Sequence, residues 1–346
     1  MNSGNIKEYI SGFDWVKLLG SVLIAAFHVW LYYVVIRDNW TIKKVVVYLF
    51  GVVLLFFMMS GYLMYGSLKR KKNPAKYLFQ YILKYSICYV CAYLLYYIPI
   101  YADIYRKTGI FMWKDMLFVI VTSPVRTNAL YHLWFIPPLL CGVLIVTPVF
   151  LCNKEKLFLR ILIPAVIVCV CLTTYSDLCR QIPFLTTIYD SQLSYAILRV
   201  LSEIVARGIA FVFAGMWIAK YRESFEAWNY KRWILPAVAM TVLEEIVLQY
   251  CVEDVNWIDM NFSIIFWALL TFYGVLHIKG TFLKKYHAGV ALFSGILYFL
   301  HIWEAEWLHK FGISDRLTVF LLTIAMNLFF TYLICKGKEI HILRKK

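Results

Sequence analysis

The residues with the clearest chemical potential lie near the start of the chain, where Lys17 and His28 enclose ten residues that carry no charge. On an α-helix, eleven residues turn through about 1,100°, so both side chains face the same side, about 16 Å apart along the axis. An ionisable group inside a membrane is costly and usually lines a cavity or a path. An imidazole titrates near neutral pH, as a general base requires. The spacing therefore predicts a polar path that holds a base, although a snorkelling lysine beside a packed histidine would give the same pattern.

Further polar residues interrupt apolar stretches later in the chain. They are His132, Glu203, Arg207, Glu244, Glu245, His301 and Glu304. On the topology derived below, all of them lie with His28 in the outer half of the bilayer, and this shared depth favours a polar cavity. Ordinary packing explains each residue alone. Glu203 and Arg207 have the spacing of an i,i+4 ion pair, and Glu304 is placed to hold the ring of His301.

The composition predicts membrane helices as the elements that position these residues. The 346 residues are 62% hydrophobic and 16% charged, whereas soluble domains are roughly 45–50% apolar and about 25% charged. A span needs about 20 largely apolar residues. We predict an all-α polytopic membrane bundle of about ten transmembrane helices, which form a single domain over residues 1–346. The predicted spans are 15–36, 45–66, 78–100, 129–152, 158–174, 204–220, 233–251, 262–279, 287–309 and 316–335.

Positive charge is unevenly distributed among the segments that join these spans. Lys and Arg concentrate in alternate segments, beginning with the run Lys69–Lys72, and cytoplasmic segments of membrane proteins carry this excess. Both termini are therefore predicted to be cytoplasmic, with long loops at 101–128 and 175–203 outside. The net charge of +15 follows from this topology, so we expect no nucleic-acid partner. The nine Cys residues have no regular spacing and predict neither a disulfide framework nor a metal site.

A step of small residues, Ser60-Gly61, lies near the cytoplasmic end of the second span and precedes the basic run Lys69–Lys72. Missing side-chain bulk beside several cations would admit a phosphate-rich ligand. Small residues also let helices pack closely, and the basic run satisfies the topology rule by itself. Both interpretations stay open at this point.

Several motifs, read together, are similar to one known family. The Lys17 to His28 spacing, "FFMMSGYLM", "YHLWFIPPLLCGVLIVTP", "ARGIAFVFAGMWIA" and "ILYFLHIW" occur in that order. They resemble the acyltransferase 3 family of integral membrane acyltransferases, in the branch that includes the membrane half of vancomycin-resistance serine racemases. The family carries Arg where this chain has Lys17. It also carries Arg pairs after the second span, where this chain has only Lys84.

The resemblance implies a membrane acyltransferase, most simply an O-acetyltransferase of a bacterial plasma membrane. It would move an acyl group from cytoplasmic acyl-CoA, such as acetyl-CoA, to a hydroxyl of a cell-surface saccharide, without a metal. His28 would be the catalytic base or would itself carry the acyl group, with Glu304 or Glu244 stabilising its imidazolium. The expected donor-binding residues are Lys17, Ser60, Gly61 and Lys84. The expected residues for the acceptor or the developing oxyanion are His132, Trp134, Arg207, Tyr298 and His301.

Two other function classes fit a polar cavity in a helical bundle. A transporter or flippase for a small polar solute or amino acid would need no acyl-CoA. A non-catalytic membrane partner in glycan assembly would tolerate His28→Ala without any change beyond stability.

Overall fold

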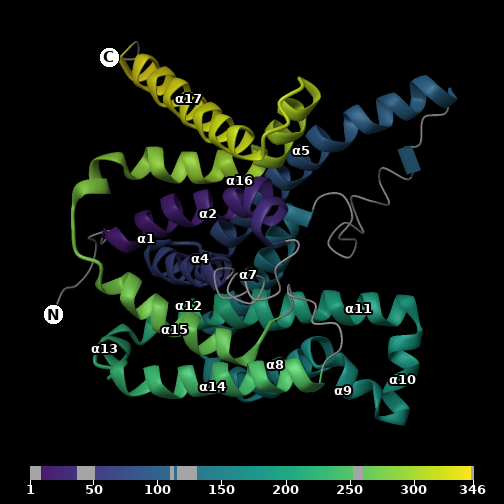
Figure 1. Ribbon diagram of the computed structural model, residues 1–346. Coiled ribbons are helices and arrows are strands. Elements are labelled where there is room, and N and C mark those ends of the chain that lie inside the picture. Colours follow the sequence, from purple (N-terminus) through teal and green to yellow (C-terminus); the bar gives the residue numbers. More distant parts are fainter. Residues whose placement is uncertain (1–8, 37–50, 110–112, 115–130, 252–259, 344–346) are drawn as a thin grey trace. The chain divides into compact units, whose positions relative to one another are not determined.

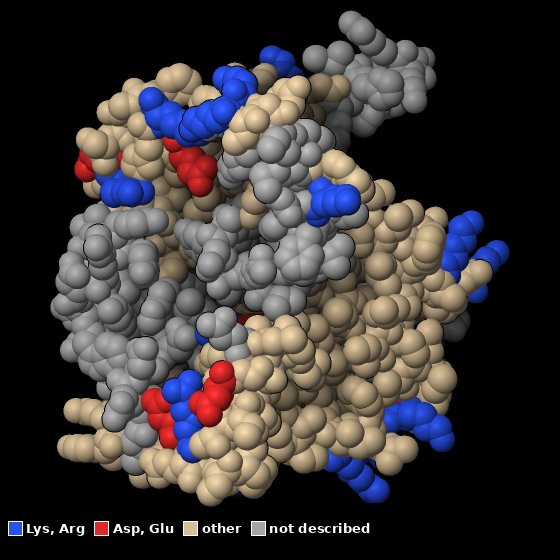
Figure 2. Space-filling view, turned by 90° about the vertical axis from the view of Figure 1, so that its right-hand side faces the viewer, with Lys and Arg blue, Asp and Glu red and all other residues tan. Residues whose placement is uncertain are grey.

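The computed structural model describes residues 9–36, 51–109, 113–114, 131–251 and 260–343. All regular elements among these residues are helices, and eight of the described helical segments are long and apolar enough to cross a membrane. On the face drawn in Figure 2, most of the described surface is uncharged, and charged side chains gather in a few small groups. These features confirm the predicted polytopic helical membrane protein.

Two of the ten predicted spans fall outside those eight helices, but both are helical. The predicted eighth span is the shorter apolar helix α15 (Phe262–His277). The predicted sixth span is the end of a continuous helix that comprises α11 (Gln192–Ser202), η4 (Glu203–Ile209) and α12 (Ala210–Lys220).

The described chain divides into two compact units. Unit 1 comprises residues 1–52 and 274–346, and unit 2 comprises residues 53–273, so the boundary falls inside α15. The elements of unit 1 are α1 (Ser11–Trp15), η1 (Val16–Gly20), α2 (Ser21–Ala26), η2 (Phe27–Ile36), η5 (Phe282–Tyr286), α16 (His287–Lys310) and α17 (Arg316–Leu343). The remaining elements of unit 2 are α4 (Gly51–Arg70), α5 (Pro74–Thr108), η3 (Tyr131–Phe135), α7 (Ile136–Leu151), α8 (Glu155–Thr174), α9 (Ser176–Arg180), α10 (Pro183–Asp190), α13 (Arg222–Glu226) and α14 (Lys231–Cys251).

In unit 1 the first spanning segment packs against the last two helices, and Figure 1 shows α2, α16 and α17 side by side. The segment is not a uniform α-helix, because η1 and η2 are π-helical. These wider turns carry Lys17 and His28, so the relation expected from ideal α-helical geometry does not apply to the pair. π-helical turns within α-helices occur frequently at functional sites, and sequence periodicity does not reveal them.

The turn before α17 is built by a local cap. The Asp315 carboxylate accepts a 2.7 Å hydrogen bond from the Thr318 backbone amide, as an N-cap side chain does. The hydrogen bonds from Thr318 hold the pKa of the Asp315 carboxyl below its usual range. This cap fixes where the chain reverses between α16 and α17.

Unit 2 is packed through close contacts between helix backbones. A side chain at Gly61 of α4 would collide with the Val212 carbonyl of α12, and one at Gly208 of η4 would collide with the Pro138 carbonyl of α7. Glycine at these positions therefore lets helix backbones touch, as small residues commonly do in membranes.

The connecting segment predicted at 175–203 is largely helical and not an irregular loop, because it contains three helices, α9, α10 and α11. The apolar residues of α11 recur at helical spacing, with Leu193, Ile197 and Leu201 exposed on it. An apolar stripe on a short helix of this kind suits the membrane interface. Of the second predicted outer loop, 101–128, the first part continues α5 to Thr108, and most of the rest lies outside the described residues.

Candidate functional site

A pair of histidines forms the centre of the polar region in unit 1. The rings of His28, from η2, and His301, from α16, stack with centroids 5.6 Å apart and an interplanar angle of 25°. Their exposed fractions are 7% and 1%. Both residues are candidates from the sequence, but the sequence does not predict that their rings contact each other. The structure brings them together because α16 packs along the first spanning segment.

The hydrogen bond of His301 fixes which ring nitrogen is basic. Its Nδ1 lies 2.7 Å from the Leu297 carbonyl oxygen, and a carbonyl only accepts, so Nδ1 carries the hydrogen. In the neutral ring, Nε2 then holds the lone pair. Such a ring accepts a hydrogen bond from a hydroxyl but donates none to an oxyanion. The expected oxyanion role of His301 therefore requires an imidazolium, whereas hydroxyl binding does not.

Glu304 and Tyr298 flank His301 on α16, each one turn away. Glu304 is fully buried, and its Oε2 accepts a hydrogen bond from the Asn327 side chain of α17. The expected contact between Glu304 and an imidazolium is not among its described interactions. Asn327 was missed by the sequence reasoning. Its signal was a lone amide in the last apolar span, which in a membrane usually marks a polar partner on a neighbouring helix.

At the other end of the same segment, Lys17 is held by an acid. Its Nζ donates to Asp14 at 3.1 Å, and the Asp14 carboxylate also lies 2.8 Å from His287 Nδ1. Asp14 is fully buried and the Lys17 side chain is 16% exposed. The sequence shows Asp14 three residues before Lys17, an ordinary i,i+3 pairing, but nothing in the sequence links either residue to His287.

The remaining predicted donor-binding residues lie in unit 2. Lys84 is exposed on α5, with its ammonium 5.5 Å from the Tyr85 ring centroid. The Ser60 hydroxyl donates to the Phe56 carbonyl at 2.8 Å. Gly61 corrects the expectation of an open passage, because the space left by its missing side chain is filled by the α12 backbone. Gly61 therefore serves close packing between helices, which was the alternative interpretation of the Ser60-Gly61 pair.

Arg207 of η4 has the partner that its spacing predicts. The guanidinium donates to both carboxylate oxygens of Glu203 at 2.5 Å, and its Cζ lies 5.1 Å from the Trp134 ring centroid. Trp134 reaches this position because the Gly208 backbone contacts α7, the helix that follows η3. The side chain of His132, also in η3, lies outside the part of the chain whose side chains are described.

A pocket opens beside this ion pair. It is small, with room for about one water molecule, and it is lined by Thr173, Arg199, Ser202, Glu203, Arg207 and Met260. Arg199 was missed by the sequence reasoning, although Arg199, Glu203 and Arg207 follow one another at i,i+4 spacing and so share one helix face. On the predicted topology, Thr173, Arg207 and Met260 all lie at the outer ends of their spans.

Glu244 of α14 is committed to the start of α15. Its carboxylate accepts hydrogen bonds from the backbone amides of Phe262 and Ser263 at 2.7 and 2.8 Å, and from the hydroxyls of Tyr175 and Ser263 at 2.5 Å each. A carboxylate at a helix N-terminus is favoured by the helix dipole. Because these contacts use both carboxylate oxygens, we assign Glu244 a capping role and no role in catalysis.

The comparisons with known proteins agree with the motifs. The sequence matches the model of the acyltransferase 3 family, described as an acyltransferase domain, over residues 10–336. The match covers elements of both units. Searches of the curated proteins and of the solved structures gave no significant match.

Proposed function

Because the chain belongs to the acyltransferase 3 family, we propose that this membrane acyltransferase is an O-acetyltransferase. It takes the acetyl group from cytoplasmic acetyl-CoA and gives it to a hydroxyl of a cell-surface saccharide. The observation that carries the proposal is the stacked pair of buried histidines in unit 1. A hydroxyl acceptor needs a base near neutral pH, and imidazole is the side chain that supplies one.

His28 acts on the acceptor in the simplest form of the reaction. It removes the proton from the hydroxyl while the oxygen attacks the thioester carbonyl. The C–S bond breaks as the C–O ester bond forms, and the imidazolium returns its proton to the thiolate, so that CoA leaves as the thiol. His301, with Nδ1 held by Leu297, keeps a lone pair on Nε2, which accepts a hydrogen bond from a neighbouring hydroxyl of the saccharide and so orients the acceptor.

A two-step relay uses the same residues. In this version the His28 ring attacks the thioester and carries the acetyl group, and CoA thiol is released first. The acceptor hydroxyl then attacks the acetyl carbonyl, and the C–N bond to the His28 ring breaks as the C–O ester bond forms. His301 Nε2 takes the hydroxyl proton and passes it to the released His28 ring. The relay predicts CoA release in the absence of any saccharide, followed by label retained on the protein.

The donor approaches from the cytoplasmic side in this proposal. Lys17 lies at the cytoplasmic end of the first segment on the predicted topology, and its ammonium is oriented by Asp14. Lys84 and the exposed run Lys69–Lys72 add positive charge that attracts the CoA phosphates. Asp14 thus holds the ammonium of Lys17, and 16% of the Lys17 side chain remains exposed.

The test uses purified protein in lipid vesicles with radiolabelled acetyl-CoA and a crude envelope glycan extract. CoA release and label transfer are measured for the native chain and for His28→Ala. We expect His28→Ala to lower CoA release roughly 10²- to 10⁴-fold, the usual contribution of a general base. His277→Ala is the matched control, because His277 is exposed at the end of α15, and it is expected to retain native activity.

Equal CoA release by native protein and a folded His28→Ala variant would remove His28 from the chemistry. No release by the native protein with acetyl-CoA or longer acyl-CoA donors would overturn the proposal in favour of transport, which needs no acyl donor. Folding of each variant is checked by its thermal unfolding temperature in detergent.

A further inference from the structure

A buried polar cluster joins α16 to α17 within unit 1. It consists of Glu304 from α16 and of Thr323 and Asn327 from α17, and all three residues are fully buried. Glu304 lies one turn after His301, whose ring stacks on that of His28. Buried polar groups in proteins are nearly always hydrogen-bonded, so the partners of each polar atom in this cluster can be counted.

The hydrogen bonds of Asn327 fix the orientation of its side-chain amide. The amide nitrogen donates to Glu304 Oε2 and, at 2.8 Å, to the Thr323 carbonyl oxygen. A carbonyl oxygen only accepts, so the nitrogen of the amide and not its oxygen must face it. Both amide hydrogens are thereby used, and the amide oxygen Oδ1 is left as an acceptor beside the carboxyl group of Glu304.

Two acceptors in the cluster lack a donor. Glu304 Oε1 and Asn327 Oδ1 are buried, and no described group donates a hydrogen bond to either of them. The Thr323 hydroxyl also has no described partner, but it holds a single hydrogen, which satisfies at most one of the two acceptors. An unsatisfied buried acceptor costs free energy, so the cluster needs one more hydrogen.

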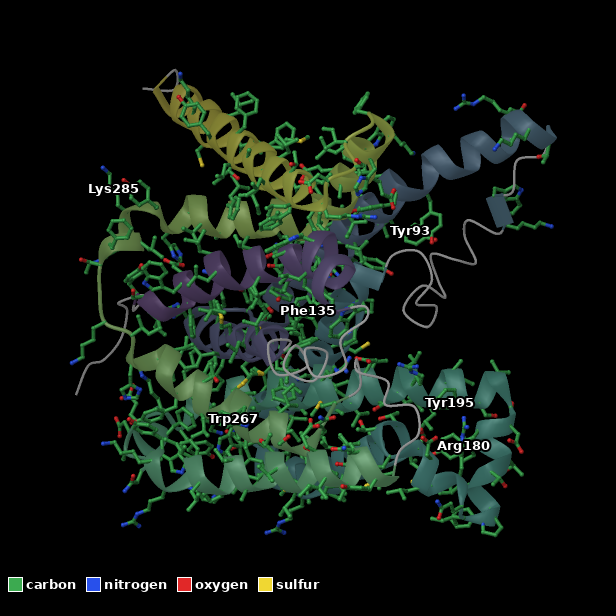
Figure 3. The ribbon with its side chains drawn as sticks, in the orientation of Figure 1. Tyr93, Phe135, Arg180, Tyr195, Trp267 and Lys285 are labelled. Atoms are coloured by element: carbon green, nitrogen blue, oxygen red, sulfur yellow. The ribbon has the colours of Figure 1, made fainter. Side chains whose placement is uncertain are left out.

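An ionised Glu304 would also lack a cation, because its described hydrogen bond comes from the neutral amide of Asn327. Among the cations on the elements packed against α16, Lys17 is held by an acid and Arg316 contacts a histidine. Lys285 lies at the start of α16, at the opposite end from the turn into α17 (Figure 3), about 28 Å from Glu304 along the helix axis. A carboxylate without a partner is costly inside a membrane.

We infer that Glu304 is held as a neutral carboxylic acid, with its proton on Oε1. The acid O–H donates to Asn327 Oδ1 while the amide N–H donates to Glu304 Oε2, which is the face-to-face pair that a carboxylic acid and a primary amide form. One proton thus removes both unsatisfied acceptors and the buried charge. A proton needs no cavity, so the packing between α16 and α17 need not change.

The neutral pair gives Glu304 a positioning role. Asn327 is anchored to its own helix by the Thr323 carbonyl, so its two hydrogen bonds with Glu304 set the depth and rotation of α16 against α17. His301 lies on the same helix and is thereby placed where its ring stacks on His28. This positioning role rests on the proposed function. It replaces the role of imidazolium counter-ion expected for Glu304, because a neutral acid carries no charge.

Infrared spectroscopy tests the protonation of Glu304. The native chain and Glu304→Gln are purified in a detergent without carbonyl groups and measured at neutral pH, where an ordinary glutamate, with a pKa of about 4.3, is ionised. We expect the native chain to show the C=O stretching band of a carboxylic acid, and Glu304→Gln to lose it. Glu306→Gln, which removes an exposed acid from the same helix, is the matched control and should keep the band. A native spectrum without the band, or a band that Glu304→Gln retains in full, would overturn the inference.

Thermal unfolding in the same detergent tests the pairing. Asn327→Leu leaves the acid without its partner, so we expect the unfolding temperature to fall by about 2 °C or more. The amide introduced by Glu304→Gln pairs with Asn327 in the same way as a neutral acid, so this variant should unfold at nearly the native temperature. Native stability of Asn327→Leu would contradict the pair.

Initial rates of CoA release test the positioning role. Glu304→Gln should keep kcat within about threefold of the native value, whereas a counter-ion or proton-transfer role predicts a loss of roughly 10²-fold or more. Such a loss in folded Glu304→Gln would overturn the positioning role, because the amide preserves the pair.

The infrared band and the unfolding temperature need no turnover, so this inference and the proposed function can fail separately. A protein that shows the band but releases no CoA would refute the proposed function and support the neutral pair. A protein that releases CoA in a His28-dependent way without the band would do the opposite.

Discussion

The histidine pair of unit 1 and the arginine pocket of unit 2 both place ionisable residues on π-helical turns within long apolar segments, yet they hold those residues differently. In unit 1 the rings of His28 and His301 stack on each other, and a backbone carbonyl orients one of them. In unit 2 a carboxylate and an aromatic face hold the Arg207 guanidinium.

The difference follows from the two kinds of work proposed for the groups. A base must keep a lone pair available for a proton. Stacking uses the faces of the rings and therefore does not occupy the lone pairs of the ring nitrogens. The Arg207 guanidinium is instead held in one position, because the Glu203 carboxylate and the Trp134 ring both contact it.

The largest effect that would test this comparison comes from the histidine pair. If His28 and His301 act as one unit, His28→Gln and His301→Gln should each lower kcat roughly 10²- to 10⁴-fold, and the double variant should lose little more than the worse single variant. Additive losses in kcat would show that the rings act independently.

The next largest effect should come from a change in helix packing, whose cost in stability we expect to differ between the two units. Gly208→Ala places a methyl group against the Pro138 carbonyl, whereas Gly295→Ala on α16 meets no atom within 4 Å. We expect Gly208→Ala to cost about 1–3 kcal/mol of stability, the usual cost of overpacking. Gly295→Ala should be neutral or gain up to ~1 kcal/mol from helix propensity.

Thermal and denaturant unfolding in detergent would measure both glycine variants. Equal stability of Gly208→Ala and Gly295→Ala would mean that the η4 and α7 backbones can separate without cost, and the argument that Gly208 positions Trp134 would then fail.

The smallest expected effect concerns two lysines that each pair with a buried acid. Lys17→Gln leaves Asp14 in contact with His287, and Lys220→Gln leaves Glu155 with the Tyr221 hydroxyl at 2.9 Å. Only Lys17 is a proposed donor-binding residue, so only Lys17→Gln should raise the KM for acetyl-CoA, by roughly threefold to tenfold, or ~0.7–1.4 kcal/mol.

Initial-rate kinetics against acetyl-CoA would measure both lysine variants. A matching rise in KM for Lys220→Gln would indicate a general loss of positive charge, and an unchanged KM for Lys17→Gln would remove Lys17 from the donor path.

The sequence by itself determined the class of protein and most of the candidate residues. Composition and apolar runs predict a helical membrane bundle because a helix is the simplest way to satisfy backbone polar groups in lipid. Ordered motifs from Lys17 to "ILYFLHIW" identify the family over nearly the whole chain. The i,i+4 spacing of Glu203 and Arg207 predicts their ion pair, since partners on one helix depend only on local geometry.

Only the tertiary structure decided which partners lie far apart in the sequence. The contacts of His28 with His301 and of Asp14 with His287 join the two ends of the chain, and the contact of Glu304 with Asn327 joins α16 to α17. Periodicity gives the face of a helix, but not the helix that faces it. The π-helical turns, the filled space at Gly61 and the capping role of Glu244 likewise depend on neighbouring backbones, which is why local sequence patterns could not predict them.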